Sequence, residues 1–189
     1  MKEIIEDREF RNVDFSSEKF QLADYEYCEF IGCSFSNVDL SNISFLECNF
    51  KDCDLTSAKL LSTSFKTVSF NTCKLLGLHF DRCNAFLLEM SFIGCQLDLS
   101  SFYKLVLKKI QFEDCSLKEV DFVETDLTEA VFKNCDLTGA VFENTVLIKT
   151  DLRSSTGYTI DPETNQIKKM MVSSSELPGL LSKYDIQIS

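Results

Sequence analysis

A five-residue period runs through most of this chain and restricts it to a small set of folds. From Phe10, a large apolar residue recurs at every fifth position up to Phe80, and after a two-residue slip the series resumes at Leu87 and ends at Leu152. Of the 17 phenylalanines, only Phe86 stands outside these central positions. The period fits neither an α-helix nor a β-strand, whose side chains repeat every 3.6 and 2 residues. It predicts a chain that turns a corner every five residues, so that four repeats close a square coil.

The position two residues before each centre is also restricted, mostly to small or apolar residues. If four repeats form a coil, residues 20 apart should stack into columns. A slip placed as a bulge at 81–84 preserves two such columns across it. One is made of cysteines and the other of phenylalanines: Cys33, Cys53, Cys73, Cys95, Cys115 and Cys135; Phe10, Phe30, Phe50, Phe70, Phe92, Phe112 and Phe132.

The cysteines fit core packing better than metal or redox chemistry. Nine is an odd number, so they cannot form a closed disulfide framework. Side chains in one column point the same way, whereas tetrahedral zinc needs four convergent ligands. Cysteine is a small, readily buried hydrophobe. We therefore expect no metal site and no cofactor.

Several repeats resemble the A(D/N)LXX unit of the pentapeptide repeat family, among them residues 53–57, 130–134 and 135–139. The resemblance spans residues 10–154 and implies an all-β solenoid, a right-handed quadrilateral β-helix. Coils spaced by about 4.8 Å give a rod of about seven coils, roughly 34 Å long. We expect the solenoid over residues 1–154, with residues 1–9 as an N-terminal cap.

Residues 155–189 form a different kind of sequence, which contains both prolines, Pro162 and Pro178. Ser174 or Ser175 is a candidate N-cap, and Pro178 suits a first helical turn. The sequence predicts a short helix that either caps its own rod or joins its twin in a two-fold homodimer. The residues expected at this capping or dimerisation surface are Leu177, Leu180, Leu181, Tyr184 and Ile186, with Ile188 continuing the apolar pattern.

Charge excludes one class of function. The chain has 30 acidic against 19 basic residues and a formal charge of -11. Such a surface opposes direct nucleic-acid binding, which needs clustered Lys and Arg. No apolar run approaches the ~18 residues that cross a bilayer, so we expect a soluble, cytoplasmic protein that binds no membrane.

An enzymatic function has little support in the sequence. His79 is the only histidine and lies four residues before Cys83, so a cysteine–histidine pair is conceivable. Such a dyad needs a third orienting group and a pocket. A solenoid filled with phenylalanine offers no pocket, and we expect a non-catalytic protein.

The tail also resembles those of the quinolone-resistance and microcin B17 immunity types of the family. That resemblance implies a homodimer, with DNA gyrase or a related type II topoisomerase as partner and the acidic rod as a mimic of duplex DNA. The large loops of some quinolone-resistance members are missing here. Candidate partner-binding acids cluster between residues 113 and 136: Glu113, Asp114, Glu119, Asp121, Glu124, Asp126, Glu129 and Asp136. The alternative is that these acids only solvate the outer surface.

A second hypothesis is a structural or regulatory scaffold that binds another protein. Apolar residues stand at nominally outward positions in and after the slip: Phe86, Leu88, Ile93, Leu99, Tyr103 and Val106. An exposed apolar patch would indicate a partner site. The alternative is that the bulge folds over these residues and buries them.

Overall fold

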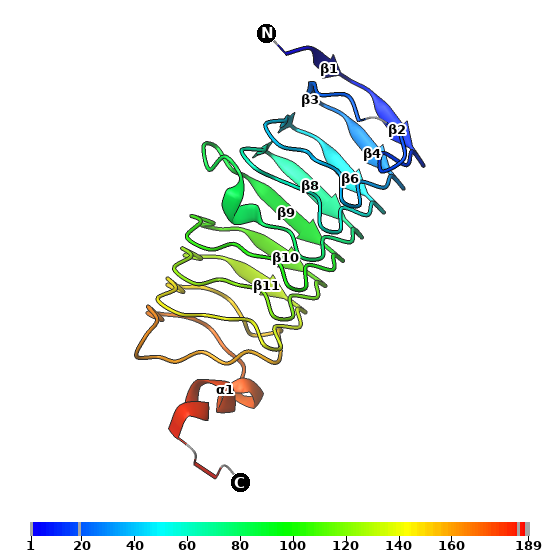
Figure 1. Ribbon diagram of the computed structural model, residues 1–189. Coiled ribbons are helices and arrows are strands. Elements are labelled where there is room, and N and C mark those ends of the chain that lie inside the picture. Colours follow the sequence, from blue (N-terminus) through cyan, green and yellow to red (C-terminus); the bar gives the residue numbers. More distant parts are fainter. Residues whose placement is uncertain (1, 19, 185, 188–189) are drawn as a thin grey trace.

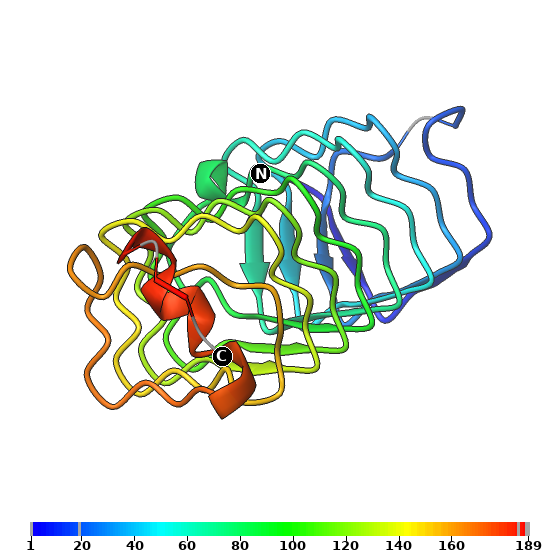
Figure 2. The same ribbon diagram turned by 90° about the horizontal axis from the view of Figure 1, so that it is seen from below.

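The chain winds into an elongated solenoid of short parallel strands, and a small helix follows its last coil (Figure 1). The computed structural model describes residues 2–18, 20–184, 186 and 187. Figure 2 shows the helix lying across the C-terminal end of the solenoid. Over this part of the chain, no helix has the length and apolar character that a bilayer crossing requires.

Two parallel sheets form two of the four faces. The continuous face carries seven strands: β2 (Glu9–Arg11), β4 (Glu29–Ile31), β6 (Asn49–Lys51), β8 (Val68–Asn71), β9 (Met90–Ile93), β10 (Gln111–Glu113) and β11 (Val131–Lys133). The interrupted face carries four: β1 (Ile4–Glu6), β3 (Asp24–Glu26), β5 (Ser44–Leu46) and β7 (Ser64–Lys66). The other two faces are joined by isolated parallel bridges. We call them the cysteine face, with centres such as Leu117, and the closing face, with centres such as Phe122.

The predicted columns are confirmed, and they fill the interior. On the continuous face, Phe50 pairs with Phe70 and, across the slip, Phe70 pairs with Phe92. The Phe92 ring stacks on those of Phe70 and Phe112 at centroid distances of 5.3 and 5.2 Å. All six members of the cysteine column are buried. The sequence period therefore becomes a stack of aromatic and thiol layers.

The corners explain how a chain full of turns contains so few glycines. The residue two after a centre usually has a positive φ, as in Asn37 (60°) and Glu119 (55°). This left-handed backbone is uncommon for residues other than glycine. Here each corner is held by the next coil: the Glu119 N–H donates to the Thr138 carbonyl at 3.0 Å. Regular stacking thus supports conformations that an isolated turn would leave to glycine.

The solenoid differs from the prediction at both ends. Residues 4–11 form β1 and β2 and belong to the first coil, so the expectation of a separate cap at residues 1–9 is wrong. At the other end, bridges join Val146 to Gln166 and Asp151 to Met171, past the expected boundary at 154. Asn165 takes an inward position there, and its Oδ1 accepts the Thr145 N–H at 2.8 Å. The sequence series of large apolar centres stops earlier because Gly157 and Pro162 stand five and ten residues after Leu152.

The slip is also displaced from its predicted place. Ala85 stands two residues before the expected centre Leu87 and was therefore expected to be inward. Cys83 takes the inward position instead, because the Asn84 N–H donates to the Thr63 carbonyl at 2.9 Å and keeps the chain in register up to that point. The extra residues leave the coil at 85–88, and Leu87, expected as a repeat centre, is 64% exposed. The Asn84 Oδ1 accepts the Phe86 N–H at 3.0 Å and so shapes the turn. A short 3-10 turn, η1 (Phe80–Arg82), precedes this loop.

The tail folds as η2 (Ser174–Glu176), α1 (Pro178–Leu181) and η3 (Ser182–Tyr184). Pro178 occupies the first helical turn, as expected. The expected caps are wrong: Ser173 precedes η2, Leu177 precedes α1, and neither side chain caps its helix. Ile188 lies outside the described residues.

Candidate functional site

The eight predicted acids do not lie on one surface. Glu113 lies on the continuous face, and Asp114 lies at the corner that follows it. Asp126 and Glu129 lie on the interrupted face. The other four lie on the cysteine and closing faces, which are adjacent: Glu119, Asp121, Glu124 and Asp136. Only these last four are brought together.

Two further acids join them. The cysteine and closing faces between residues 96 and 144 carry six acids against two lysines, and we call this surface the acidic side. Its acids are Asp98, Glu119, Asp121, Glu124, Asp136 and Glu143, and its lysines are Lys104 and Lys118. Asp98 and Glu143 were missed because they fall outside the linear window of 113–136. Sorting residues by their 20-residue columns would have found them.

The carboxylates of the acidic side are held in place by the local turn geometry. The Asp136 Oδ1 accepts the Thr138 N–H at 3.0 Å and its hydroxyl at 2.6 Å, while Lys118 lies 3.2 Å from Oδ2. The Thr138 hydroxyl, the Thr138 N–H and Lys118 together hold the pKa of Asp136 below its usual range. The Asp121 Oδ1 accepts the Val123 N–H at 2.9 Å. Asp136 therefore presents fixed negative charge at neutral pH, and the Asp121 carboxylate is held in one orientation.

Ion pairs neutralise only part of this surface. Lys104 lies 3.4 Å from Glu124 and Lys118 is paired with Asp136. Among the residues that the structure describes, Glu119 and Glu143 form no ion pair. The acidic side keeps a net negative charge after its lysines are counted.

The interrupted face, which is opposite the cysteine face, carries charge of the opposite sign. On the interrupted face beyond Val106, five lysines face two acids, Asp126 and Glu129, and we call these lysines the lysine strip. It consists of Lys108, Lys109, Lys149, Lys168 and Lys169. Backbone bonds align it, since the Lys109 N–H donates to Thr128 and the Lys149 N–H to Lys168. The lysine strip therefore lies opposite the cysteine face and next to the closing face, and charge is segregated between the faces of the C-terminal half.

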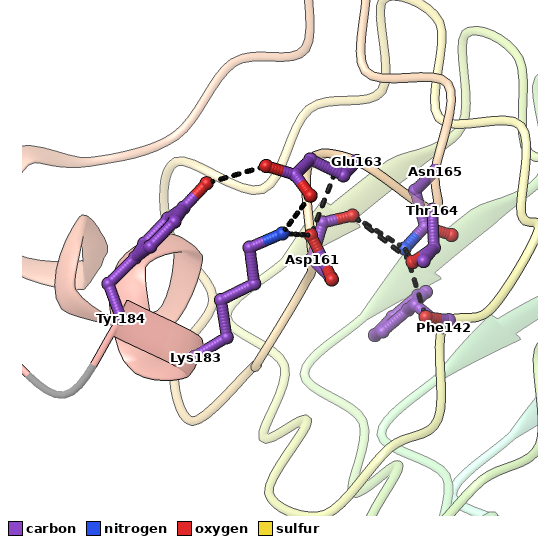
Figure 3. Close-up of polar contacts among 7 residues, drawn as sticks. All are labelled: Phe142, Asp161, Glu163, Thr164, Asn165, Lys183 and Tyr184. Carbon is purple, nitrogen blue, oxygen red and sulfur yellow. Dashed lines mark hydrogen bonds and ion pairs between the residues drawn. The ribbon is translucent and has the colours of Figure 1, made fainter.

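The tail is fastened to its own rod (Figure 3). Lys183 Nζ lies 2.6 Å from Asp161 Oδ1 and 2.8 Å from Glu163 Oε2, and the Tyr184 hydroxyl donates to Glu163 at 2.9 Å. The Ile160 N–H donates to the Gly179 carbonyl at 3.0 Å. A Cβ at position 179 would lie 2.1 Å from the Tyr158 carbonyl oxygen, so this close approach requires glycine.

The predicted tail residues divide into two groups. Leu180 packs against the core, and Leu181 is half-buried. The remaining three are exposed by 45–55%: Leu177, Tyr184 and Ile186. Leu180 therefore packs onto the end of the rod, and the three exposed residues leave an apolar surface there.

The structure does not assemble the conceivable cysteine–histidine pair into a catalytic centre. The His79 ring is largely exposed, and its Nδ1 lies 3.2 Å from Asp81. Cys83 is buried, and burial raises the pKa of its thiol, which disfavours the thiolate. All nine cysteines are free and buried. Within the described residues, no cluster of metal-ligating side chains is found.

The outward apolar residues do not form one patch. Phe86 and Val106 are 69% and 63% exposed, and Leu88 is half-buried beside the core. Ile93 is exposed on the continuous face, and Leu99 is exposed at a corner of the cysteine face. Tyr103 is half-buried, and its hydroxyl donates to Glu124 at 3.2 Å.

Two solved structures agree with this architecture. Two trypsin-treated variants of QnrB1, described as a plasmid-mediated fluoroquinolone resistance protein, are each 20% identical with a TM-score of 0.50. They cover 98% and 97% of this chain and 100% and 99% of their own. HetL, a pentapeptide repeat protein of the cyanobacterium Nostoc, is 17% identical with a TM-score of 0.47, and the match covers 90% of this chain and 87% of HetL.

At the level of sequence, no curated protein matches the chain. The family model described as a pentapeptide repeat region matches residues 23–86, 63–142 and 87–160. These matches together cover more than half of the chain. The chain therefore belongs to the pentapeptide repeat family.

Proposed function

We propose that this protein is a non-catalytic partner of DNA gyrase or a related type II topoisomerase and protects it from a quinolone or a gyrase-directed toxin. The acidic side carries this proposal. It would bind the enzyme where duplex DNA binds. The fold shared with a fluoroquinolone resistance protein also supports the proposed function.

The mimicry rests on rigid negative charge carried by successive coils. The six acids of the acidic side stand in six different columns, on coils spaced by about 4.8 Å, which is comparable to the ~3.4 Å between phosphates along one DNA strand. Because backbone N–H groups orient Asp121 and Asp136, little side-chain freedom is lost when they meet a basic surface. A DNA-binding saddle rich in Lys and Arg is the complementary partner.

A two-fold dimer would extend this surface. Leu177, Tyr184 and Ile186 leave apolar area exposed at the C-terminal end. Because a two-fold contact pairs the same patch of both copies, it would place two rods end to end. We propose that the tail both caps its own rod and supplies this contact.

Supercoiling of relaxed plasmid by gyrase tests the proposal. Purified protein is titrated in, with and without a quinolone, and we expect inhibition at high concentration or rescue from the drug. A triple variant, Glu119→Lys, Glu124→Lys and Glu143→Lys, should lose the effect. The matched control, Glu6→Lys, Glu26→Lys and Glu47→Lys, changes the net charge equally on the interrupted face of the N-terminal half and should keep it. Equal behaviour of both variants, or no effect of the folded wild type, contradicts the proposal.

A scaffold that binds another protein is the second candidate. The exposed loop at 85–88 favours it, since Phe86 and Leu87 are 69% and 64% exposed. Substitutions on the acidic side should leave such binding unchanged, and substitutions in the loop should abolish it.

A further inference from the structure

The displaced loop opens a groove in the wall of the solenoid. Its volume is about 610 Å³, with residues 87–91 along one side and 106–111 along the other. Figure 1 shows the loop in green, protruding beside β9. The groove lies on the interrupted face, where β7 would otherwise be followed by another strand.

Backbone hydrogen bonds are missing along one wall of this groove. Toward the following coil, residues 105–109 make three bonds: the Asp126 N–H donates to Leu105, and the Leu107 and Lys109 N–H groups donate to Asp126 and Thr128. The three equivalent hydrogen bonds toward the preceding coil would use the N–H of Val106, the C=O of Val106 and the C=O of Lys108. None of these groups has a backbone partner in the described chain. The wall is thus an unpaired strand edge inside the solenoid.

The groove combines apolar and basic side chains. Leu88, Met90, Leu107 and Ile110 line it, all buried or half-buried, and Val106 is exposed at its edge. Lys108 and Lys109 rise from the same edge with side chains 57% and 77% exposed, and they begin the lysine strip. Glu89 is the one acid among the lining residues.

We propose that this groove binds an extended acidic peptide segment of a partner protein as an added strand, parallel to the coils. The peptide backbone pairs with Val106 and Lys108, which gives affinity without sequence preference. Its alternate apolar side chains enter the groove, and its acidic side chains meet Lys108 and Lys109. An unpaired edge is a template for such pairing, and native proteins normally cover or blunt it.

Charge complementarity selects an acidic rather than a basic segment. The chain as a whole carries -11, so most of its surface repels an acidic peptide. The groove edge and the lysine strip are the exception. This inference does not depend on the topoisomerase proposal, because the acidic side lies on other faces.

Titration with two short model peptides tests the inference, one alternating glutamate with valine and the other alternating lysine with valine. Binding is followed by fluorescence anisotropy of a labelled peptide and by amide chemical shifts of the full-length protein. We expect only the acidic peptide to bind, with the largest shifts at 106–109 and with new protection of the Val106 amide from exchange. Equal binding of both peptides, binding without protection at Val106, or no binding contradicts the inference.

Two variants separate backbone pairing from simple charge attraction. Val106→Pro removes the free N–H but leaves the bonds of Leu105 and Leu107 to Asp126, and it should weaken binding about fivefold. Lys108→Glu with Lys109→Glu should weaken it about tenfold or more. The matched charge control is Lys59→Glu with Lys74→Glu, two exposed lysines on the closing and cysteine faces, and it should bind nearly as the wild type does. If Val106→Pro is folded and binds as the wild type does, backbone pairing is refuted. The exchange measurement on the wild type decides the question if that variant does not fold.

Discussion

The continuous and interrupted faces of the solenoid start from the same repeat and respond differently to the same two extra residues. On the continuous face, β8 pairs with β9 across the slip, and the stack of phenylalanine rings is unbroken. On the interrupted face the sheet ends at β7. The insertion is therefore absorbed on one face, and the adjoining face keeps its register.

The difference shows what determines whether a repeat stays in a coil. Phe92 stacks on Phe70 and Phe112 and loses their contact if it shifts. On the interrupted face, Ala85 stands at the central position in the coil after Phe65. Burial of its small side chain contributes little free energy to folding. The chain leaves the coil where the central residue offers the least burial.

Truncation of a centre on each face should give the largest contrast. Phe92→Ala should destabilise the protein by about 3–5 kcal/mol, because Phe92 is fully buried. Leu87→Ala should change stability by less than about 0.5 kcal/mol, because Leu87 is exposed. Urea unfolding followed by circular dichroism measures both. Similar losses for the two variants would refute the placement of Leu87 outside the core.

Removal of the insertion should convert the interrupted face into a continuous one. Deletion of Phe86 and Leu87 together with Ala85→Leu places a leucine at the vacant centre and should stabilise the protein by about 1–3 kcal/mol. The same deletion with Ala85 retained is the control and should gain less. Binding of the acidic peptide should be lost with the groove. A large loss of stability in both deletions would show that the loop itself supports the fold.

Alkaline pH should weaken the thiol layers. Burial raises the pKa of Cys48 to about 12, whereas an unfolded cysteine titrates near ~8.5. The folded state then holds its proton where the unfolded state releases it, so stability is intact below pH ~8.5 and falls as pH rises above it. The free energy of unfolding of each protein is measured at neutral pH and at pH ~9.5. Over this range the wild type should lose about 1.4 kcal/mol more than Cys48→Ala does. Identical pH profiles would contradict burial of a protonated thiol.

The smallest expected effect is at the tail. Lys183→Ala removes the ion pairs to Asp161 and Glu163, which lie on the surface, and should change global stability by less than about 1 kcal/mol. Hydrogen exchange at residues 178–184 should nevertheless become faster, since the tail loses its fastening. Lys168→Ala is a control, being a surface lysine outside the tail. Unchanged exchange in the tail would show that Gly179 and Leu180 suffice to hold it.

The sequence predicted the columns well because every coil repeats the same packing problem. Phe112 and Cys115 had to be inward, since a shift of one position would expose their whole columns. The ends and the slip were harder to predict. Asn165 is inward although it is polar, because its side chain satisfies the Thr145 N–H. Leu87 matched the period but is exposed, because Asn84 stays in register and forces the extra length into a turn.

The candidate site was only partly predictable for a related reason. Glu119, Asp121, Glu124 and Asp136 were found, but a linear window also collected acids from the other faces. Glu143 joins Glu124 through a bond from the Glu124 N–H to the Glu143 carbonyl, a relation that only the coil register reveals. The groove could not be predicted, because it arises from hydrogen bonds that are not made.

Amide hydrogen exchange of Val106 and Gln111 tests the central contrast most directly. These residues lie five apart in one coil, Val106 on the interrupted face and Gln111 on the continuous face, where it pairs with Ser91. The account predicts fast exchange at Val106, which faces the groove, and slow exchange at Gln111. Equal and strong protection of both amides would mean that the interrupted face is closed, and it would contradict the account.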